Sequence, residues 1–127
     1  MTLLVVAAGG AMGAVSRYLA TGWVQDLTGD SFPWGTFLVN VVGSLVLGFS
    51  MVWLQSAVSS ADLRQFITIG FLASFTTFST FSYEAMVMLR DREWWQAGGY
   101  VVGSVALSLT AVVVGMAVAS ALTQGRT

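Results

Sequence analysis

The chain has 127 residues, of which 56% are hydrophobic and only 9% are charged, and its formal net charge is −1. About a quarter of the residues in a soluble domain are charged, so this composition predicts an integral membrane protein. The slightly negative net charge gives no basic surface for binding nucleic acid. The chain contains no cysteine and no histidine, which excludes disulfides, thiolate chemistry and the commonest general base and metal ligand.

Four apolar stretches are each long enough to cross the hydrocarbon core of a bilayer, which takes about 20 helical residues. These spans are expected at residues 3–23, 34–54, 63–89 and 96–122, within one all-α domain of residues 1–127. The first stretch lacks the basic start of a signal peptide and is therefore interpreted as a span. The tryptophans lie near the ends of the spans, where indole rings favour the lipid headgroup region.

Small residues recur four positions apart in three of the spans. This spacing puts both members of a pair on one helix face and allows two helix backbones to approach closely in lipid. The pairs predict a tightly packed bundle and say little about function. They are Gly9 with Gly13, Ser44 with Gly48, and Gly99 with Gly103.

The arginines give almost no preference for one orientation in the membrane. Four spans put Arg64 and Arg126 on one side and Arg90 and Arg92 on the other, and Arg17 lies within the first span. Equal numbers of arginines on the two sides provide no positive-inside signal. The chain either inserts in both orientations, which allows an antiparallel dimer, or has this balance by chance because it carries so few charges.

Polar side chains are concentrated on one face of the second span and one face of the fourth. A polar group in hydrocarbon needs a partner, so these stripes are expected to converge on a narrow polar path. Hydroxyls and a carboxamide can donate hydrogen bonds to a small anion, and no ring of carboxylates favours cations. Taken singly, such hydroxyls usually bond to a carbonyl of their own helix. The stripes comprise Asn40 and Ser44 on the second span and Tyr100, Ser104 and Ser108 on the fourth.

The third span contains the segment SFTTFSTFSYE, residues 74–84. Five of the seven side chains in residues 76–82 carry hydroxyls, a composition that disfavours helix and predicts a break in mid-membrane. The ends of a broken helix expose carbonyls and amides that bind ions. Phe78 and Phe81 either pack the core or present the positively polarised edges of their rings to an anion. Glu84 is the single acid near the end of this span.

The segment GFLASFTTFSTFSYE closely resembles the third-helix signature of the bacterial Fluc-type (CrcB-like) fluoride channels. GGAMGAVSRY, PWGTFLVNVVGS and GYVVGSVALS resemble the other helices of that family in the same order, so the resemblance covers nearly the whole chain. It implies a dual-topology antiparallel homodimer with two pores in the inner membrane of a bacterium. The implied function is passive, electrogenic export of fluoride, which protects the cytoplasm from this ion.

The resemblance also implies roles for particular residues. Backbone carbonyls of Ala73 and Thr76 would hold a structural Na⁺ at the dimer centre, Arg17 would lie near a vestibule or the helix ends, and Glu84 matches the acid that follows the signature. The family usually has two glycines where this chain has Ala73 and Ser74, so the sodium site requires a backbone conformation that a Cβ tolerates. The implied fluoride path comprises Phe78, Phe81, Asn40, Ser79, Thr80, Tyr100, Ser104 and Ser108.

Other classes of protein account for less of the sequence. A proton-coupled small multidrug-type transporter also has four short helices and dual topology, but it needs an acid in the first span, and this chain offers only Glu84 in the third. A non-conducting scaffold subunit leaves the aligned polar stripes unexplained. An enzyme is not expected, because Glu84 has no second acid, histidine or cysteine to pair with. A pair of different, oppositely inserted subunits is an alternative to the homodimer.

Overall fold

The computed structural model describes residues 1–125, and this part of the chain contains helices but no strands. Its four candidate spans are long and apolar enough to cross a membrane, which confirms the predicted all-α architecture. Arg126, which entered the arginine count, lies outside the described residues. The elements are α1 (Thr2–Thr28), α2 (Trp34–Ala57), α3 (Ala61–Gln65), η1 (Phe66–Leu72), α4 (Ala73–Phe75), α5 (Phe78–Arg90) and α6 (Trp94–Gln124).

The helices continue beyond the expected apolar segments, because hydropathy marks where the chain is apolar and not where its helical hydrogen bonds stop. Helix α1 ends at Thr28, where Gly29 takes the left-handed conformation with φ 59°. The side-chain amide of Gln25 holds the following loop in place by donating hydrogen bonds to the carbonyls of Asp30 (2.6 Å) and Phe32 (2.9 Å). In this loop, hydrogen bonds from the Phe32 amide and the Trp34 indole hold the pKa of Asp30 below its usual range.

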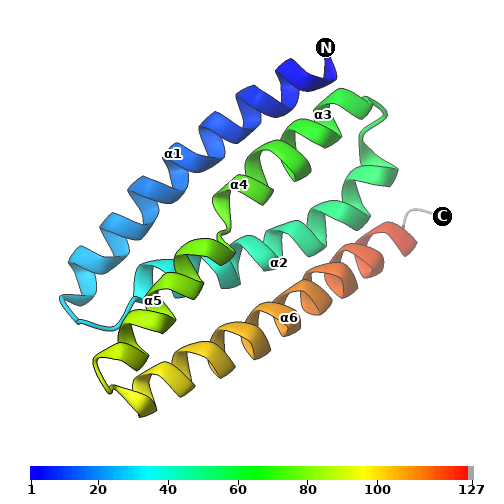
Figure 1. Cartoon of the computed structure of the whole chain (residues 1–127). Coiled ribbons are helices and arrows are strands. Elements are labelled where there is room, and N and C mark those ends of the chain that lie inside the picture. The colour runs from blue at the N-terminus through cyan, green and yellow to red at the C-terminus, as the bar shows by residue number, and fades with distance from the viewer. Residues whose placement is uncertain (126–127) are drawn as a thin grey trace.

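The third span crosses from one side of the bundle to the other (Figure 1). Its first half, η1 and α4, packs against α1, whereas α5 packs against α6. Helices α2 and α6 lie along each other and form the most extensive contact between elements. The third span therefore joins the α1 side of the molecule to the α2–α6 pair.

Glycines permit these close crossings. A Cβ on Gly48 would collide with the carbonyl of Val112, and a Cβ on Gly115 would collide with that of Leu45, so both helices of the α2–α6 pair need a glycine. Gly9 and Gly13 bring α1 against η1 in the same way. The predicted pair Gly99–Gly103 behaves differently: a Cβ on Gly99 meets no atom within 4 Å, so this pair makes no close backbone crossing within the subunit.

The third span is irregular in two places. Phe66–Leu72 forms a π-helix where it packs on α1, and Gly70 of this π-helix lies against Gly9 of α1. Between α4 and α5 the chain leaves the helical conformation, with Thr76 at φ −87°, ψ 157° and Thr77 at φ −148°, ψ 123°. Two extended residues therefore separate the halves of this span.

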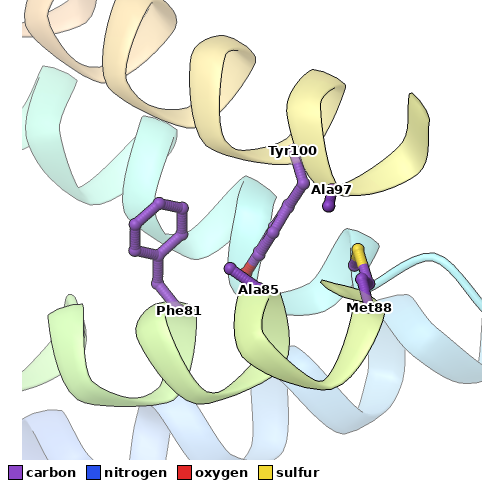
Figure 2. Packing of buried hydrophobic residues seen from close by; sticks show 5 residues of the cluster. All are labelled: Phe81, Ala85, Met88, Ala97 and Tyr100. Atoms are coloured by element: carbon purple, nitrogen blue, oxygen red, sulfur yellow. The ribbon is translucent and has the colours of Figure 1, made fainter. Parts of the chain in front are cut away.

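The buried cluster between α5 and α6 fixes the second half of the third span (Figure 2). Tyr100 is its centre, with no exposed surface, and its ring centroid lies 5.1 Å from that of Phe81. Phe32 from the α1–α2 loop stands edge-on to Tyr100 at 5.4 Å. The remaining members of the cluster are Ala85, Met88 and Ala97.

Candidate functional site

The interruption between α4 and α5 is held by an asparagine of α2. The Thr77 amide donates to Asn40 Oδ1 at 2.8 Å, and Asn40 Nδ2 donates to the Thr77 carbonyl at 3.0 Å. One side chain thus satisfies both backbone polar groups of Thr77. The Thr77 hydroxyl in turn accepts a hydrogen bond from the Thr80 amide at 3.2 Å and caps the start of α5.

The interruption leaves carbonyls before α5 without their usual helical donors, among them those of Ala73 and Thr76. In a continuous helix the amides of Thr77 and Thr80 would bond to the carbonyls of Ala73 and Thr76, four residues earlier. Here those amides donate to Asn40 and to the Thr77 hydroxyl instead. The two carbonyls are the ones that the sequence resemblance assigns to sodium.

Ala73 has helical backbone angles, φ −66° and ψ −27°, so the Cβ that replaces the family's glycine causes no strain. At the next residue, the Ser74 carbonyl accepts a hydrogen bond of 3.1 Å from Arg17 Nε. A cation therefore lies at the C-terminal end of α4, where it offsets the partial negative charge of the helix end. This places Arg17 at a helix end.

A cavity of about 310 Å³ lies beside the interruption. Its lining joins α2, the interruption, α5 and α6. Two phenylalanines belong to it but differ in burial: Phe81 is 8% exposed and Phe78 is 78% exposed. Asn40, Ser104 and Ser108 also line it, so five of the eight predicted path residues meet here. The full lining is Asn40, Ser44, Thr76, Thr77, Phe78, Phe81, Ser104, Val105, Ser108 and Leu109.

The hydroxyl of Ser104 is buried in this lining without a hydrogen-bond partner among the described residues. The side chain is 5% exposed. Several hydroxyls on these helices bond back to their own helix, as Thr110 does to the Ala106 carbonyl at 2.7 Å. An unpaired buried hydroxyl costs free energy, so Ser104 has a donor and lone pairs available for something that enters the cavity.

A second cavity, of about 260 Å³, lies on the other side of Thr77, which lines both. In it Glu84 accepts hydrogen bonds from Thr36 Oγ1 (2.9 Å) and from the Tyr100 hydroxyl (2.8 Å). Arg17 faces the same cavity, but no Arg17–Glu84 ion pair forms within 4.0 Å in the described structure. The lining comprises Arg17, Thr21, Gly22, Gln25, Gly35, Thr36, Thr77, Thr80 and Glu84.

The remaining predicted path residues occupy distinct positions. Thr80 lines the second cavity, and Tyr100 lines neither cavity but reaches Glu84 through its hydroxyl. Ser79 is exposed, and its hydroxyl lies 3.4 Å from that of Thr77. Sequence reasoning missed Thr36, although it extends the stripe of Asn40 by one helical turn. It also missed Thr21 and Gln25, although they follow Arg17 at i+4 and i+8 on one face of the first span.

Four candidate membrane spans, with two cavities beside the interrupted third span, define a multi-pass membrane protein. The chain belongs to the CrcB-like protein family: residues 4–116 match the family described as CrcB-like protein, Camphor Resistance (CrcB). This confirms the family that the sequence motifs indicate, and with it a multi-pass membrane protein.

Relatives that carry a functional name match along nearly their whole length. The fluoride-specific ion channel FluC of Geobacter sulfurreducens is 47% identical over 95% of this chain and 98% of its own. The protein of the same name from Geotalea uraniireducens is 48% identical with the same coverage. That of Hahella chejuensis is 46% identical over 91% of each chain. These relatives are named as ion channels, in agreement with the expectation that the chain is not an enzyme.

Proposed function

We propose that this protein is a fluoride-specific ion channel that lets fluoride leave the cell passively and electrogenically. The names of its relatives support this substrate. The observation in the molecule that carries the proposal is the unpaired, buried hydroxyl of Ser104 in a cavity beside the start of α5.

The chemistry of the first cavity suits a small, strongly hydrated anion. Such an ion gives up water only if hydrogen-bond donors replace it at close range. Serine hydroxyls on α2 and α6 supply donors, and α5 begins at Phe78 with the positive end of its helix dipole at the cavity wall. Many moderate contacts, in place of one deep trap, let the ion leave again.

The second cavity extends the path toward the α1–α2 loop. Arg17 supplies positive charge there, and Thr77 and Thr80 supply hydroxyls. The carboxylate of Glu84 is occupied by donors from Thr36 and Tyr100, which reduces its repulsion of a passing anion. We infer that fluoride passes from one cavity to the other beside Thr77.

We further propose that two copies form a dual-topology antiparallel homodimer with two pores, and that the interruption lies in mid-membrane at the contact between copies. Ala73, Phe78 and Ser79 are all exposed around the interruption. Lipid cannot satisfy the carbonyls freed there, whereas a cation shared with a second copy can. The large exposed ring of Phe78 would then line the path of the partner subunit.

The freed carbonyls of Ala73 and Thr76 suit a bound Na⁺. Carbonyl oxygens at unwound helix segments are typical sodium ligands in membrane proteins. Two carbonyls from each copy would provide four ligands at the dimer axis, and the ion would offset the repulsion between these oxygens. Sodium would thereby hold the two copies together.

The test is ion efflux from liposomes that contain the purified protein. Vesicles are loaded with fluoride or with chloride, and a potassium ionophore removes the opposing charge. Rapid loss of fluoride with retention of chloride is expected. Retention of fluoride by vesicles that contain well-folded protein would contradict the proposed function.

A further inference from the structure

We propose that Asn40 is a positioning residue, whose carboxamide keeps Thr77 extended and thereby maintains the interruption of the third span. The sequence resemblance assigns Asn40 to the fluoride path as a donor. The geometry points to a different main task, because the amide is already engaged with the backbone of Thr77 at 2.8 and 3.0 Å. The consequence for flux rests on the proposed function, whereas the backbone role does not.

The two hydrogen bonds match a requirement of the backbone. Both polar groups of an extended residue inside the bundle need partners, since no helix or strand neighbour supplies them. Asn40 offers one acceptor and one donor in a plane, and Thr77 presents one donor and one acceptor. If the carboxamide is lost, both backbone polar groups of Thr77 lose their partners, and the segment around the interruption opens more readily.

Through Thr77 this contact acts on both cavities. Thr77 lines each of them, and its hydroxyl caps α5 by accepting from the Thr80 amide. The start of α5 in turn sets where Phe81 enters the first cavity. A shift of Thr77 would therefore move the wall shared by the cavities and the ring that lines one of them.

Replacement by a carboxylic acid gives a reversible test. In the Asn40→Asp variant, a protonated carboxyl can accept from the Thr77 amide and donate to its carbonyl, which restores both bonds. An ionised carboxylate can accept the hydrogen bond of the Thr77 amide, but it has no proton to donate to the Thr77 carbonyl and repels its oxygen. The lining of the first cavity contains no other ionisable side chain, and Arg17 and Glu84 across Thr77 are unchanged from the wild type.

Two quantities are measured on Asn40→Asp and on the wild type between pH 5.5 and 9: fluoride efflux from liposomes, and hydrogen exchange of the peptide that contains residues 73–82. Exchange rates are corrected for the intrinsic effect of pH. We expect exchange in the variant to become about tenfold to a hundredfold faster as the carboxyl ionises. Flux should fall over the same pH range, while the wild type changes in neither respect.

The two readouts separate positioning from direct contact with the ion. A fall in flux with unchanged protection of residues 73–82 would mean that the charge acts on fluoride directly, and would overturn the proposal. If Asn40→Asp resembles the wild type at every pH, the isosteric Asn40→Leu variant decides, because it cannot form either bond. Normal protection in Asn40→Leu would overturn the proposal, and faster exchange would support it.

Ser44→Ala is the matched control for the exchange measurement. Ser44 lies one helical turn from Asn40 on α2 and lines the same cavity, but it makes no hydrogen bond to the interruption. Protection of residues 73–82 should be unchanged in this variant. Absence of fluoride flux in the wild type would contradict the channel function alone, since the exchange result stands without it.

Discussion

At the scale of single residues, the hydroxyls of this protein differ in whether they have a hydrogen-bond partner within their own helix. Thr110, Thr68 and Thr21 donate to carbonyls of their own helices, which satisfies them locally. Ser104 makes no such bond and faces a cavity. A buried hydroxyl without a partner in the protein is the kind of group that a bound ion would satisfy.

Ser104→Ala is therefore expected to lower fluoride flux by roughly tenfold or more without lowering stability, because the hydroxyl has no hydrogen bond to lose. Efflux and thermal unfolding of the purified protein measure the two effects. Thr110→Val on the same helix is the control and should conduct normally. Normal flux in Ser104→Ala would remove this serine from the path.

Glu84→Gln distinguishes a channel from a proton-coupled transporter. A channel needs no proton uptake at this position, and glutamine can still accept from one of the two hydroxyls that now bond to Glu84. Fluoride efflux should persist at a reduced rate and should remain independent of an imposed pH gradient. If an imposed pH gradient drives the wild type to accumulate a solute, and Glu84→Gln loses this ability, a proton-coupled transporter is the better description.

At the scale of the elements, the α2–α6 pair depends on glycine at each closest approach. The crossing is so tight that a Cβ on Gly115 would lie 2.7 Å from the Phe49 amide as well as against the Leu45 carbonyl. Backbone atoms cannot rotate away as a flexible side chain does. The helices themselves would have to separate.

Gly115→Ala should consequently destabilise the protein by roughly 1–3 kcal/mol, the usual cost of overpacking a well-packed contact. Gly98→Ala on the same helix is the control, because a Cβ there meets no atom within 4 Å. Unfolding in detergent, followed by the same probe in both variants, measures the difference. Equal stability of Gly115→Ala and Gly98→Ala would mean that the α2–α6 contact is looser than described.

At the scale of the whole molecule, the proposed dual topology can be tested by labelling one introduced thiol. The chain has no cysteine, so Ser59→Cys in the exposed α2–α3 loop carries the only thiol. If copies insert in both orientations, a membrane-impermeant maleimide should label about half of them in sealed vesicles, and all of them after detergent is added. Labelling of all copies, or of none, before detergent would contradict dual topology.

The proposed sodium site makes the dimer dependent on the cation present. Replacement of Na⁺ by a large organic cation should shift the purified protein toward monomer and abolish flux, since the carbonyls of Ala73 and Thr76 would repel one another without a cation. Size-exclusion chromatography with light scattering measures the assembly. An unchanged dimer in sodium-free buffer would argue against the site.

Several residues of the site could be predicted from sequence, because the spacing that indicates them involves only nearby residues. Period and spacing put Asn40 on one face of the second span and Ser104 and Ser108 on one face of the fourth, and all three line the first cavity. Burial was less predictable: Phe78 and Phe81 are three residues apart, yet α6 covers only Phe81. The hydrogen-bond partner of each polar group could not be predicted from sequence, since the Asn40–Thr77 and Thr36–Glu84 bonds join residues 37 and 48 positions apart.

The number of spans, the polar stripes and the family follow from the sequence, because hydropathy, helical period and motif order are properties of neighbouring residues. Three features depend on the packing of distant parts of the chain: the third span crosses from α1 to α6, Asn40 bonds to the backbone of Thr77, and hydroxyls of two other helices donate to Glu84. Those features arise when groups far apart in the chain satisfy one another's hydrogen bonds. In an apolar bundle without water, that requirement selects the packing.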